Sequence, residues 1–458
     1  MGGIADYSGS LVLQLPLAEA CFVAMQVGVP PAEGAPRSLR ILSLGGGARR
    51  AQRRGGARPG AARGAPGRRA RPAGAARRAR RRLSQALAPD QAWAAYVAGV
   101  LVTLAHEFPE QDLFGAPLSL LISSSVPEGA GVSSSAAVEV ATAAAAARAF
   151  GLEGLAADGR RLALLCQRAE NEVVGAPCGV MDQMAATLGR ARGLMSLLCQ
   201  PAQFQGTLRV PDGAAFFGIN SGMRERHSVG GSSYGAVRTG AFMGLKILRS
   251  QPDSASGRPD CLANVASSEW HGLTGSDGLV RHCPERLTGR AFLERYGAHI
   301  DAATTVEDDA TYEVRAATAH PIGESLRVRL FAALLAGPPG AEQRELLGEL
   351  MRASHASYGA CGLGSAGTDR LVQLVEASRR DSLARGEAPL LHGAKITGGG
   401  SGGTVCVLAT DGPEAERLVE GILAQYAEER GGPRPAVFRS SSDGAAAFGC
   451  VRLQGTAS

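Results

Sequence analysis

The fold of this 458-residue chain is decided by the stretch Val126-Pro-Glu-Gly-Ala-Gly-Val-Ser-Ser-Ser-Ala-Ala137. It follows a short apolar run, residues 118–122, that predicts a buried strand. It precedes an Ala-rich segment, residues 136–150, that predicts a helix ended by Gly151. A strand, a glycine–serine turn and a helix in this order aim the first N–H groups of the helix at an anion. The stretch alone is equally compatible with an ordinary turn in a glycine-rich chain.

The chain has only two lysines, Lys246 and Lys395. The common phosphate loop needs a lysine after its last glycine, and protein kinases need one on a strand. Neither lysine lies in such a context. If the chain binds a nucleotide, the phosphates must be held mainly by backbone amides, serine hydroxyls and a metal ion.

Basic residues are concentrated in one segment. Residues 30–84 contain 16 arginines and one acidic residue, Glu33, whereas the rest of the chain has 32 basic and 41 acidic residues. Residues 45–82 are almost entirely Arg, Gly, Ala and Pro, which cannot bury enough apolar surface to offset the entropy of ordering. We therefore expect residues 30–85 to form a disordered Arg/Gly/Ala-rich insert. Because no aromatic residues are interleaved, nucleic acid is an unfavoured partner.

Nine cysteines are scattered along the chain without a C-x-x-C pair. This pattern argues against a disulfide framework and structural zinc, and it favours a reducing compartment. No uninterrupted apolar run approaches the roughly 18 residues of a membrane helix. No basic leader precedes an apolar core, so we expect no signal peptide. The sequence predicts a cytoplasmic protein without a membrane partner.

The remaining patterns predict alternating helices and strands. We expect a hairpin or strand pair within residues 1–29. Strands are predicted at residues 194–199, 214–219, 390–397 and 404–410. Helices are predicted at residues 91–106, 159–172, 322–335, 341–357 and 413–429, and over a segment that ends near residue 248.

Two further segments could carry chemistry. The loop Gly398-Gly-Gly-Ser-Gly-Gly403 formally matches G-x-G-x-x-G, but a strand follows it, and the dinucleotide fingerprint requires a helix there. We expect this loop to pack closely against another loop or a phosphate, and a plain hairpin turn is the alternative. Glu170 and Asp182 lie close enough in sequence to serve Mg²⁺ and a substrate hydroxyl. Asp182 alone would more simply be a helix N-cap.

Three segments together resemble the signatures of the GHMP small-molecule kinases. They are Pro127-Glu-Gly-Ala-Gly-Val-Ser-Ser-Ser-Ala-Ala137, Cys178-Gly-Val-Met-Asp-Gln183 and Lys395-Ile-Thr-Gly-Gly-Gly-Ser-Gly-Gly403. The galactokinase branch is the most similar, since Met1-Gly-Gly-Ile-Ala-Asp-Tyr-Ser-Gly9 resembles its sugar-binding signature. Gly3-Ile4 stand where galactokinases carry a Glu-His pair.

That departure is shared with the kinase domain of plant L-arabinokinases, which the chain resembles most. The segments that carry this finer resemblance are Gly179-Val-Met-Asp182, Arg226-His-Ser-Val-Gly-Gly231, His320-Pro-Ile322 and Cys361-Gly-Leu-Gly-Ser-Ala-Gly-Thr-Asp369. The arginine with which the family stabilises its reaction would lie before Met1. We therefore expect the sequence to begin inside a longer protein.

The resemblance implies an α+β, two-domain GHMP kinase fold. Residues 1–212 would form a ribosomal S5 domain 2-like N-terminal domain, and residues 213–458 a ferredoxin-like C-terminal domain. The implied reaction transfers the ATP γ-phosphate to the anomeric hydroxyl of L-arabinose, with ATP and Mg²⁺ as cofactors. Positioning and charge neutralisation would drive it without a phosphate-loop lysine.

The resemblance also assigns roles to individual residues. Asp182 would be the catalytic base or orient the sugar O1. The residues implied to contact the sugar are Asp6, Tyr7, Gly179 and Tyr234. Those implied to bind ATP are Pro127, Gly129, Gly131, Ser133, Ser134, Ser135, Ala136, Gly399 and Gly400. Ser135 and Glu170 would hold Mg²⁺, with Ser134 as the alternative serine.

Two rival functions stay open. A galactokinase would use the same machinery with a pocket enlarged for the C6 carbon, which L-arabinopyranose lacks. A non-catalytic regulator of the same fold would bind sugar and ATP without turnover. The presence of Asp182, Glu170 and the serines favours an enzyme.

Overall fold

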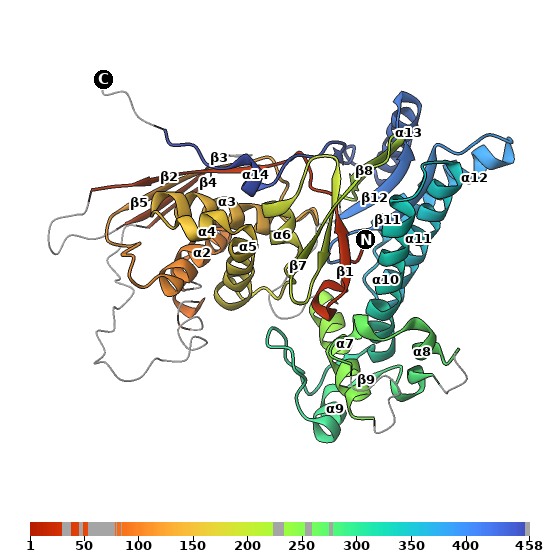
Figure 1. Ribbon diagram of the computed structural model, residues 1–458, viewed down its shortest axis with the longest axis horizontal. Helices are drawn as coiled ribbons and strands as arrows, with labels where there is room; N and C mark the ends of the chain where they lie inside the picture. Colours follow the sequence, from red (N-terminus) through yellow and green to blue (C-terminus); the bar gives the residue numbers. More distant parts are fainter. Residues whose placement is uncertain are drawn as a thin grey trace. The chain divides into compact units, whose positions relative to one another are not determined.

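The computed structural model comprises residues 1–458 and describes residues 1–29, 38–44, 49–53, 78, 80–83, 85–222, 233–251, 259–273 and 278–453. The chain folds into two compact units, each assembled from separate stretches of sequence. The smaller unit comprises Glu19–Pro127, Ser134–Leu188 and Asp443–Ser458. The larger unit comprises Met1–Ala18, Glu128–Ser133 and Gly189–Ser442. Figure 1 labels most of the helices and strands of both units.

A four-stranded sheet with the order β2-β5-β3-β4 forms one layer of the smaller unit. Its strands are β2 (Cys21–Val27), β5 (Leu118–Ser124), β3 (Leu39–Leu44) and β4 (Arg49–Arg53). Strand β5 runs antiparallel to β2 and parallel to β3, which pairs in turn with β4. Leu118, Leu120 and Ile122 of β5 are buried, whereas the residues between them are not. This two-residue period is typical of a strand that packs one face against the hydrophobic core.

Helices cover one face of this sheet (Figure 1). The helical segments of the smaller unit are η2 (Pro89–Gln91), α2 (Ala94–Glu107), α3 (Ser134–Ala149), α4 (Glu153–Ala157), α5 (Gly159–Arg168), the π-helix η3 (Ala169–Val174), α6 (Met181–Leu188) and α14 (Ala445–Phe448). The small side chains of Ala143, Ala146 and Ala147 are fully buried on α3. They let the helix pack closely in the core formed with α2 and the sheet.

The expectation that residues 30–85 lack structure is wrong for two segments. Strand β3 pairs along its whole length with β5, and β4 extends the sheet from β3. Ile41 is 4% exposed and belongs to the core of the unit. The physical reason is local composition, because residues 39–44 read Leu-Arg-Ile-Leu-Ser-Leu and supply apolar side chains that the following arginine-rich run lacks. Most other residues of the insert lie outside the described part of the chain.

Two antiparallel sheets organise the larger unit, with a short third strand pair. The first has the order β11-β12-β8-β13 and the second the order β1-β6-β7. The strands of the first sheet are β8 (Ala214–Asn220), β11 (Leu391–Ile396), β12 (Thr404–Thr410) and β13 (Val437–Phe438). The others are β1 (Leu11–Gln14), β6 (Gly193–Leu198), β7 (Gln203–Arg209), and the pair β9 (Leu287–Thr288) and β10 (Thr311–Tyr312).

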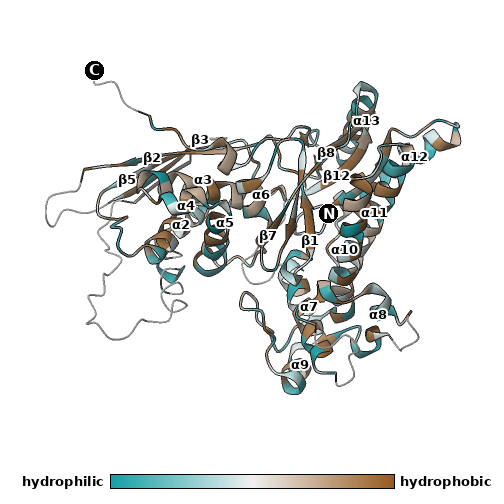
Figure 2. Ribbon diagram, in the orientation of Figure 1, coloured by the Kyte–Doolittle hydropathy of each residue, from teal (hydrophilic) through white to brown (hydrophobic). Residues whose placement is uncertain are grey.

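Helices surround these sheets within the larger unit. The α-helices are α7 (Ser233–Arg249), α8 (Ser267–His271), α9 (Gly289–Tyr296), α10 (Val314–Leu335), α11 (Ala341–Ala360), α12 (Ala366–Ala384) and α13 (Pro413–Arg430). The short 3₁₀ turns are η1 (Asp6–Ser8), η4 (Leu262–Asn264) and η5 (Leu279–His282). In Figure 2, β1 and β12 are mostly hydrophobic whereas α13 carries both colours, as expected for an amphipathic surface helix. Among the described helices, none combines the length and hydropathy needed to cross a membrane.

The α+β prediction is confirmed, and each helix and strand predicted after residue 90 is present. The predicted hairpin in residues 1–29 is wrong, because β1 pairs with β6 in the larger unit and β2 pairs with β5 in the smaller one. The same pairing places the first 18 residues and residues 189–212 in the larger unit. The sequence patterns did not predict β7 and α12, nor the short elements α4, α8, α9, α14, β9, β10 and β13.

Candidate active site

The glycine–serine turn connects β5 to α3, as predicted. Gly129, Gly131 and Ser133 have φ angles of 69°, 67° and 63°. Only glycine adopts this left-handed region at low cost, so Ser133 is held there at an energetic expense that is typical of functional turns. Helix α3 begins directly after it, at Ser134, and its first N–H groups have no partner within the helix.

This turn packs against the glycine loop at residues 398–403. The Thr404 hydroxyl donates a buried 2.8 Å hydrogen bond to the carbonyl oxygen of Ala130. A Cβ atom on Gly131 would lie 3.2 Å from the Cα of Gly403, so the two backbones meet without room for side chains. The expectation that the second glycine loop packs closely against another loop is confirmed, and the strand after it excludes the dinucleotide fingerprint.

The predicted glycines of that second loop differ in their surroundings. A Cβ on Gly399 would lie 3.5 Å from the ring of Tyr234. A Cβ on Gly400 would lie 2.7 Å from Leu363, because Gly400 is buried against that residue. Ser401, within this loop, has a φ of 61° and is the second strained non-glycine position of the two loops, after Ser133.

In the smaller unit, two buried carboxyl groups share one amide. The side-chain nitrogen of Gln183 donates to Glu170 at 2.6 Å and to Glu139 at 3.2 Å. Glu139 is 0% exposed and Glu170 is 6% exposed. Burial, and then the charge of Glu170, raise the pKa of Glu139 well above its ordinary value, and burial also raises the pKa of Glu170. The Glu139 carboxyl group also hydrogen bonds to Glu170, so this pair favours a shared proton.

Glu170 lies in the π-helix η3, a distortion that often marks functional sites. The Ser135 hydroxyl, at the start of α3, hydrogen bonds to Glu170. Asp182 lies in the first turn of α6, where the helix dipole favours its negative charge, and that charge raises the pKa of Glu170. Ser135 and Glu170 therefore lie in contact with each other, and the charge of Asp182 acts on the same carboxyl group.

The donor set at this place suits Mg²⁺. The ion prefers hard oxygen ligands and commonly takes one or two from protein, completing its shell with water and substrate phosphates. Ser135 and Glu170 supply a hydroxyl and a carboxylate in contact with each other. The buried Oε1 atom of Glu139 has no hydrogen-bond partner among the described residues, which leaves one further oxygen beside them.

The sequence analysis missed Glu139 and Gln183. Glu139 lies four residues after Ser135 and therefore on the same face of α3. A charged residue on that face of an alanine-rich helix is the sequence feature that could have indicated its place in the site. The segment between η3 and α6 is held by Asn171, whose side chain accepts a 2.8 Å hydrogen bond from the backbone N–H of Cys178. The predicted sugar contact Gly179 follows that anchor and is half-buried.

The predicted sugar signature forms a buried turn in the larger unit. Asp6 and Tyr7 are each 4% exposed. The rings of Tyr7 and Tyr234 meet edge to face, with centroids 5.9 Å apart. The Arg238 guanidinium lies 5.4 Å from the centroid of the Tyr7 ring. It donates two 2.8 Å hydrogen bonds to the Asp301 carboxylate. Asp6, Tyr7 and Tyr234 are thus brought together as predicted, while Arg238 and Asp301 were missed.

Two polar atoms at this turn, one of them from Arg238 on α7, lack a hydrogen-bond partner among the described residues. The Nη1 atom of Arg238 and the hydroxyl of Tyr7 are buried without a hydrogen-bond partner among the described residues. Burial opposes the charge of Asp301, but the hydrogen bonds and charge of Arg238 outweigh it and lower the pKa of the carboxyl group. Burial raises the pKa of Tyr7 well above its ordinary value, so the phenol stays protonated and can donate.

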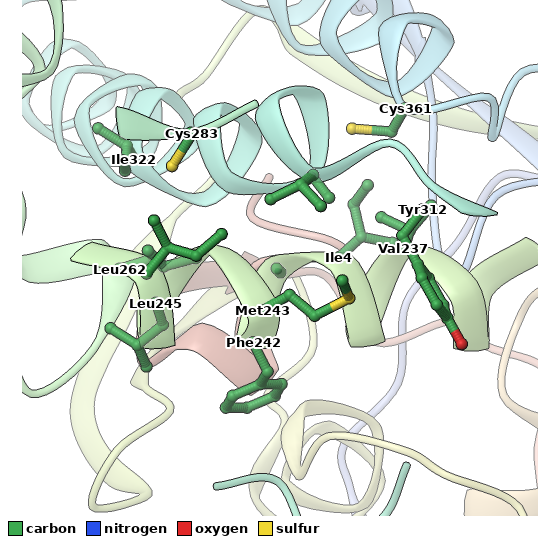
Figure 3. Packing of buried hydrophobic residues seen from close by; sticks show 14 of the residues in the cluster. Ile4, Val237, Phe242, Met243, Leu245, Leu262, Cys283, Tyr312, Ile322 and Cys361 are labelled. Atoms are coloured by element: carbon green, nitrogen blue, oxygen red, sulfur yellow. The ribbon is translucent and has the colours of Figure 1, made fainter. Parts of the chain in front are cut away.

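Gly3 and Ile4 present no polar side chain in this turn. A Cβ on Gly3 would lie 1.9 Å from the Tyr358 hydroxyl, which donates to the Gly398 carbonyl at 3.1 Å. Ile4 has a φ of 51°, an outlier for a β-branched residue, and is 1% exposed. Figure 3 shows its side chain in the core beside α7, among Val237, Tyr312 and Cys361.

The remaining predicted site residues differ in how deeply they are buried. Ala136 is buried at 1% exposure, and Pro127, Gly129, Ser134 and Ser135 are half-buried. The segment Arg226-His-Ser-Val-Gly-Gly231 lies outside the described residues. Of the predicted residues, Asp6, Tyr7, Tyr234 and both glycine loops lie in the larger unit, and Ser135, Glu170, Gly179 and Asp182 in the smaller.

Comparisons with known proteins agree with these features. Residues 95–190 match the model of the GHMP kinases N terminal domain, and residues 330–428 match that of the GHMP kinases C terminal. The L-arabinokinase of Arabidopsis thaliana is 40% identical over 499 residues, covering 99% of this chain and 46% of that protein. The chain thus spans about half the length of that relative.

Galactokinases are also similar. That of Chloroflexus aggregans is 30% identical over 340 residues, which cover 74% of this chain and 71% of the relative. A solved structure of Lactococcus lactis galactokinase in complex with galactose matches the fold with a TM-score of 0.68 at 18% identity, covering 97% of this chain and 91% of the other. The Methanococcus jannaschii mevalonate kinase structure matches with a TM-score of 0.50 at 11% identity, covering 96% and 94%.

Proposed function

Because the chain belongs to the GHMP kinase family, we propose that it transfers the γ-phosphate of ATP to the anomeric hydroxyl of L-arabinose, giving L-arabinose 1-phosphate. The observation that carries the kinase proposal is the grouping of Ser135, Glu170 and Asp182 at the beginnings of α3 and α6. These side chains supply what phosphoryl transfer needs from a protein, which is positioning and neutralisation of charge.

Each group has a role in this proposal. Asp182 accepts a hydrogen bond from the anomeric hydroxyl of the sugar and takes its proton as the new O–P bond forms. The bond between the γ-phosphorus and the β,γ-bridging oxygen breaks in the same transfer, and ADP leaves. Ser135 and Glu170 would hold Mg²⁺, which would neutralise phosphate charge when bound with ATP. The backbone N–H groups that follow Gly129 and Gly131 hold the phosphate oxygens at the positive end of α3.

The sugar turn supports a small polyol as the acceptor. The unused donors of Tyr7 and Arg238 and the carboxylate of Asp6 line one buried turn beside Tyr234. Sugar hydroxyls could satisfy these donors, which would otherwise remain unpaired at a cost of about 1–3 kcal/mol each. The choice of L-arabinose rests on the 40% identity to L-arabinokinase across 99% of the chain.

D-Galactose is the second candidate substrate. The galactokinase of Chloroflexus aggregans aligns over 71% of its own length, and galactose differs from L-arabinopyranose by the C6 carbon and its hydroxyl. The apolar, buried Ile4 favours the pentose, because it offers no polar partner where galactokinases carry their Glu-His pair.

ADP release with L-arabinose, D-galactose or no sugar, in the presence of ATP and Mg²⁺, tests the proposal. We expect release with L-arabinose and a loss of about 10²–10⁴-fold in kcat for Asp182→Asn. Asp212→Asn is the matched control, because Asp212 is exposed and pairs with the exposed Arg209. Faster turnover of galactose would overturn the substrate assignment. ATP binding without turnover of either sugar would favour the non-catalytic regulator.

A further inference from the structure

A cavity lies in the larger unit between α8 and α10. Its volume is about 270 Å³, and its wall includes Ser267, Trp270, Leu326, Arg327, Leu330 and Ser357. None of these residues belongs to the predicted kinase site. The volume falls just below the roughly 300–1,000 Å³ of pockets for drug-sized ligands, so the cavity suits a small metabolite.

The wall of this cavity combines one cation with apolar surface. The Nη2 atom of Arg327 is buried and has no hydrogen-bond partner among the described residues. Leu326 and Leu330, on the same helix, are 38% and 46% exposed, and Trp270 is buried on α8. A guanidinium edge with a free donor favours a carboxylate or phosphate, and the leucines and tryptophan favour a compact apolar group attached to it.

The Arg327 guanidinium shares its carboxylate partner with a second cation. Arg327 pairs with Glu324 through a 2.7 Å hydrogen bond from its Nε atom, and the Glu324 side chain is 0% exposed. The charge of Lys395, which is 3% exposed, acts on the same carboxylate, and its Nζ atom donates to the Ile396 carbonyl oxygen at 2.6 Å. Because Glu324 is shared, an anion bound at Arg327 would add a second negative charge to this group.

Two short hydrogen-bond paths join this cavity to the sugar turn. Glu324, the partner of Arg327, accepts a 2.9 Å hydrogen bond from the backbone N–H of Gly2. Ser357, also on the cavity wall, contacts Nδ1 of His320 at 2.8 Å, while Nε2 of His320 lies 3.1 Å from the Gly3 carbonyl oxygen.

The direction of the second path follows from chemistry. A carbonyl can only accept, so Nε2 of His320 carries the proton and Nδ1 accepts from the Ser357 hydroxyl. Both residues that these paths hold, Gly2 and Gly3, lie a few positions before Asp6 and Tyr7 in one buried turn. A group bound at Arg327 and Ser357 would therefore compete for the bonds that hold this turn.

We propose that the cavity between α8 and α10 binds a small organic anion, a carboxylate or phosphate with a compact apolar body, and that its occupancy changes the affinity of the turn at residues 2–7 for sugar. The anion would contact the Arg327 guanidinium and the Ser357 hydroxyl, with its apolar part against Trp270 and Leu326. The effect on sugar rests on the proposed kinase function, whereas the binding site itself does not.

Calorimetric titration with phenylacetate, phenyl phosphate and neutral phenylacetamide tests the site. We expect one or both anions to bind the wild-type chain and the amide not to bind. Ser267→Phe should abolish binding by filling the cavity without touching the Arg327–Glu324 pair. Ser268→Phe on the same helix, away from the cavity wall, is the matched control and should bind as the wild type does. Arg327→Lys, which keeps the charge but loses the planar fork, should weaken binding.

The effect of anion binding on the sugar turn, residues 2–7, is measured separately from catalysis. Hydrogen exchange of the amides at residues 2–7 should change when the anion binds to the wild-type chain and stay unchanged in Ser267→Phe. The dissociation constant for L-arabinose should shift by about fivefold or more. Equal binding by Ser267→Phe and the wild type, equal binding of the amide, or an absence of anion binding would overturn the site. Binding that leaves both exchange and sugar affinity unchanged would overturn the coupling. A chain that binds anions but no sugar would refute the proposed function and leave the site standing.

Discussion

The contact between the two glycine loops gives a prediction with a built-in control. Gly403 and Gly129 both have positive φ angles, 74° and 69°, so alanine at either position costs roughly 1–2 kcal/mol of backbone strain. A Cβ on Gly403 would also lie 3.1 Å from the Ala130 oxygen and 3.2 Å from the Gly131 Cα, whereas one on Gly129 meets no described atom within 4 Å. Forcing backbone apart adds about 1–3 kcal/mol. Gly403→Ala should therefore destabilise the larger unit by roughly 2–5 kcal/mol, and Gly129→Ala by the strain alone.

Tryptophan fluorescence can follow the larger unit by itself. The chain has two tryptophans, Trp93 in the smaller unit and Trp270 in the larger one. Urea unfolding in a Trp93→Phe background therefore reports on the unit that contains both loops. Thr404→Val probes the same contact independently, because it leaves the Ala130 carbonyl without its 2.8 Å partner and should cost about 1–3 kcal/mol. Equal free energies of unfolding for Gly403→Ala and Gly129→Ala would refute the reasoning.

Three further variants test the buried polar groups. Asp301→Asn should lower the thermal midpoint and raise the KM for sugar. It leaves the Arg238 side chain, which is 8% exposed, without its carboxylate partner at a cost of about 3–5 kcal/mol. An unchanged thermal midpoint would contradict this. Burial lowers the pKa of His320 from 6.5 to about 4, so the unfolded chain takes up the proton first as the pH falls from 7 toward 4. The free energy of unfolding should then drop by up to roughly 3 kcal/mol relative to His320→Gln across that range, and parallel pH profiles would refute it. Glu139→Leu should lose about 1–3 kcal/mol in urea unfolding, because the Gln183 amide loses its bond to Glu139 and keeps only the one to Glu170. Glu139→Gln should stay close to the wild type; equal losses would argue against a protonated Glu139.

Much of the fold and part of the site follow from the sequence because their signals are local. The glycines and serines after β5 require a turn whose φ angles few other residues adopt, and the helix that follows begins where the alanine run begins. The loop at residues 398–403 lies between two apolar runs that are long enough only for strands. Glu170 and Asp182 could be named because they lie within motifs of short, ordered spacing.

Other features depend on residues that meet only after folding. Strand β1 pairs with β6 and not with β2, the next strand in the sequence. Nothing within residues 1–29 indicates which of these two pairings forms. Arg238 and Asp301 are 63 residues apart, and Gln183 joins carboxyl groups 44 and 13 residues away. Local sequence determines which φ and ψ angles and which faces a segment prefers. The partner of a buried charge is chosen by the whole packed structure, because desolvation makes an unpaired charge costly wherever the chain encloses it.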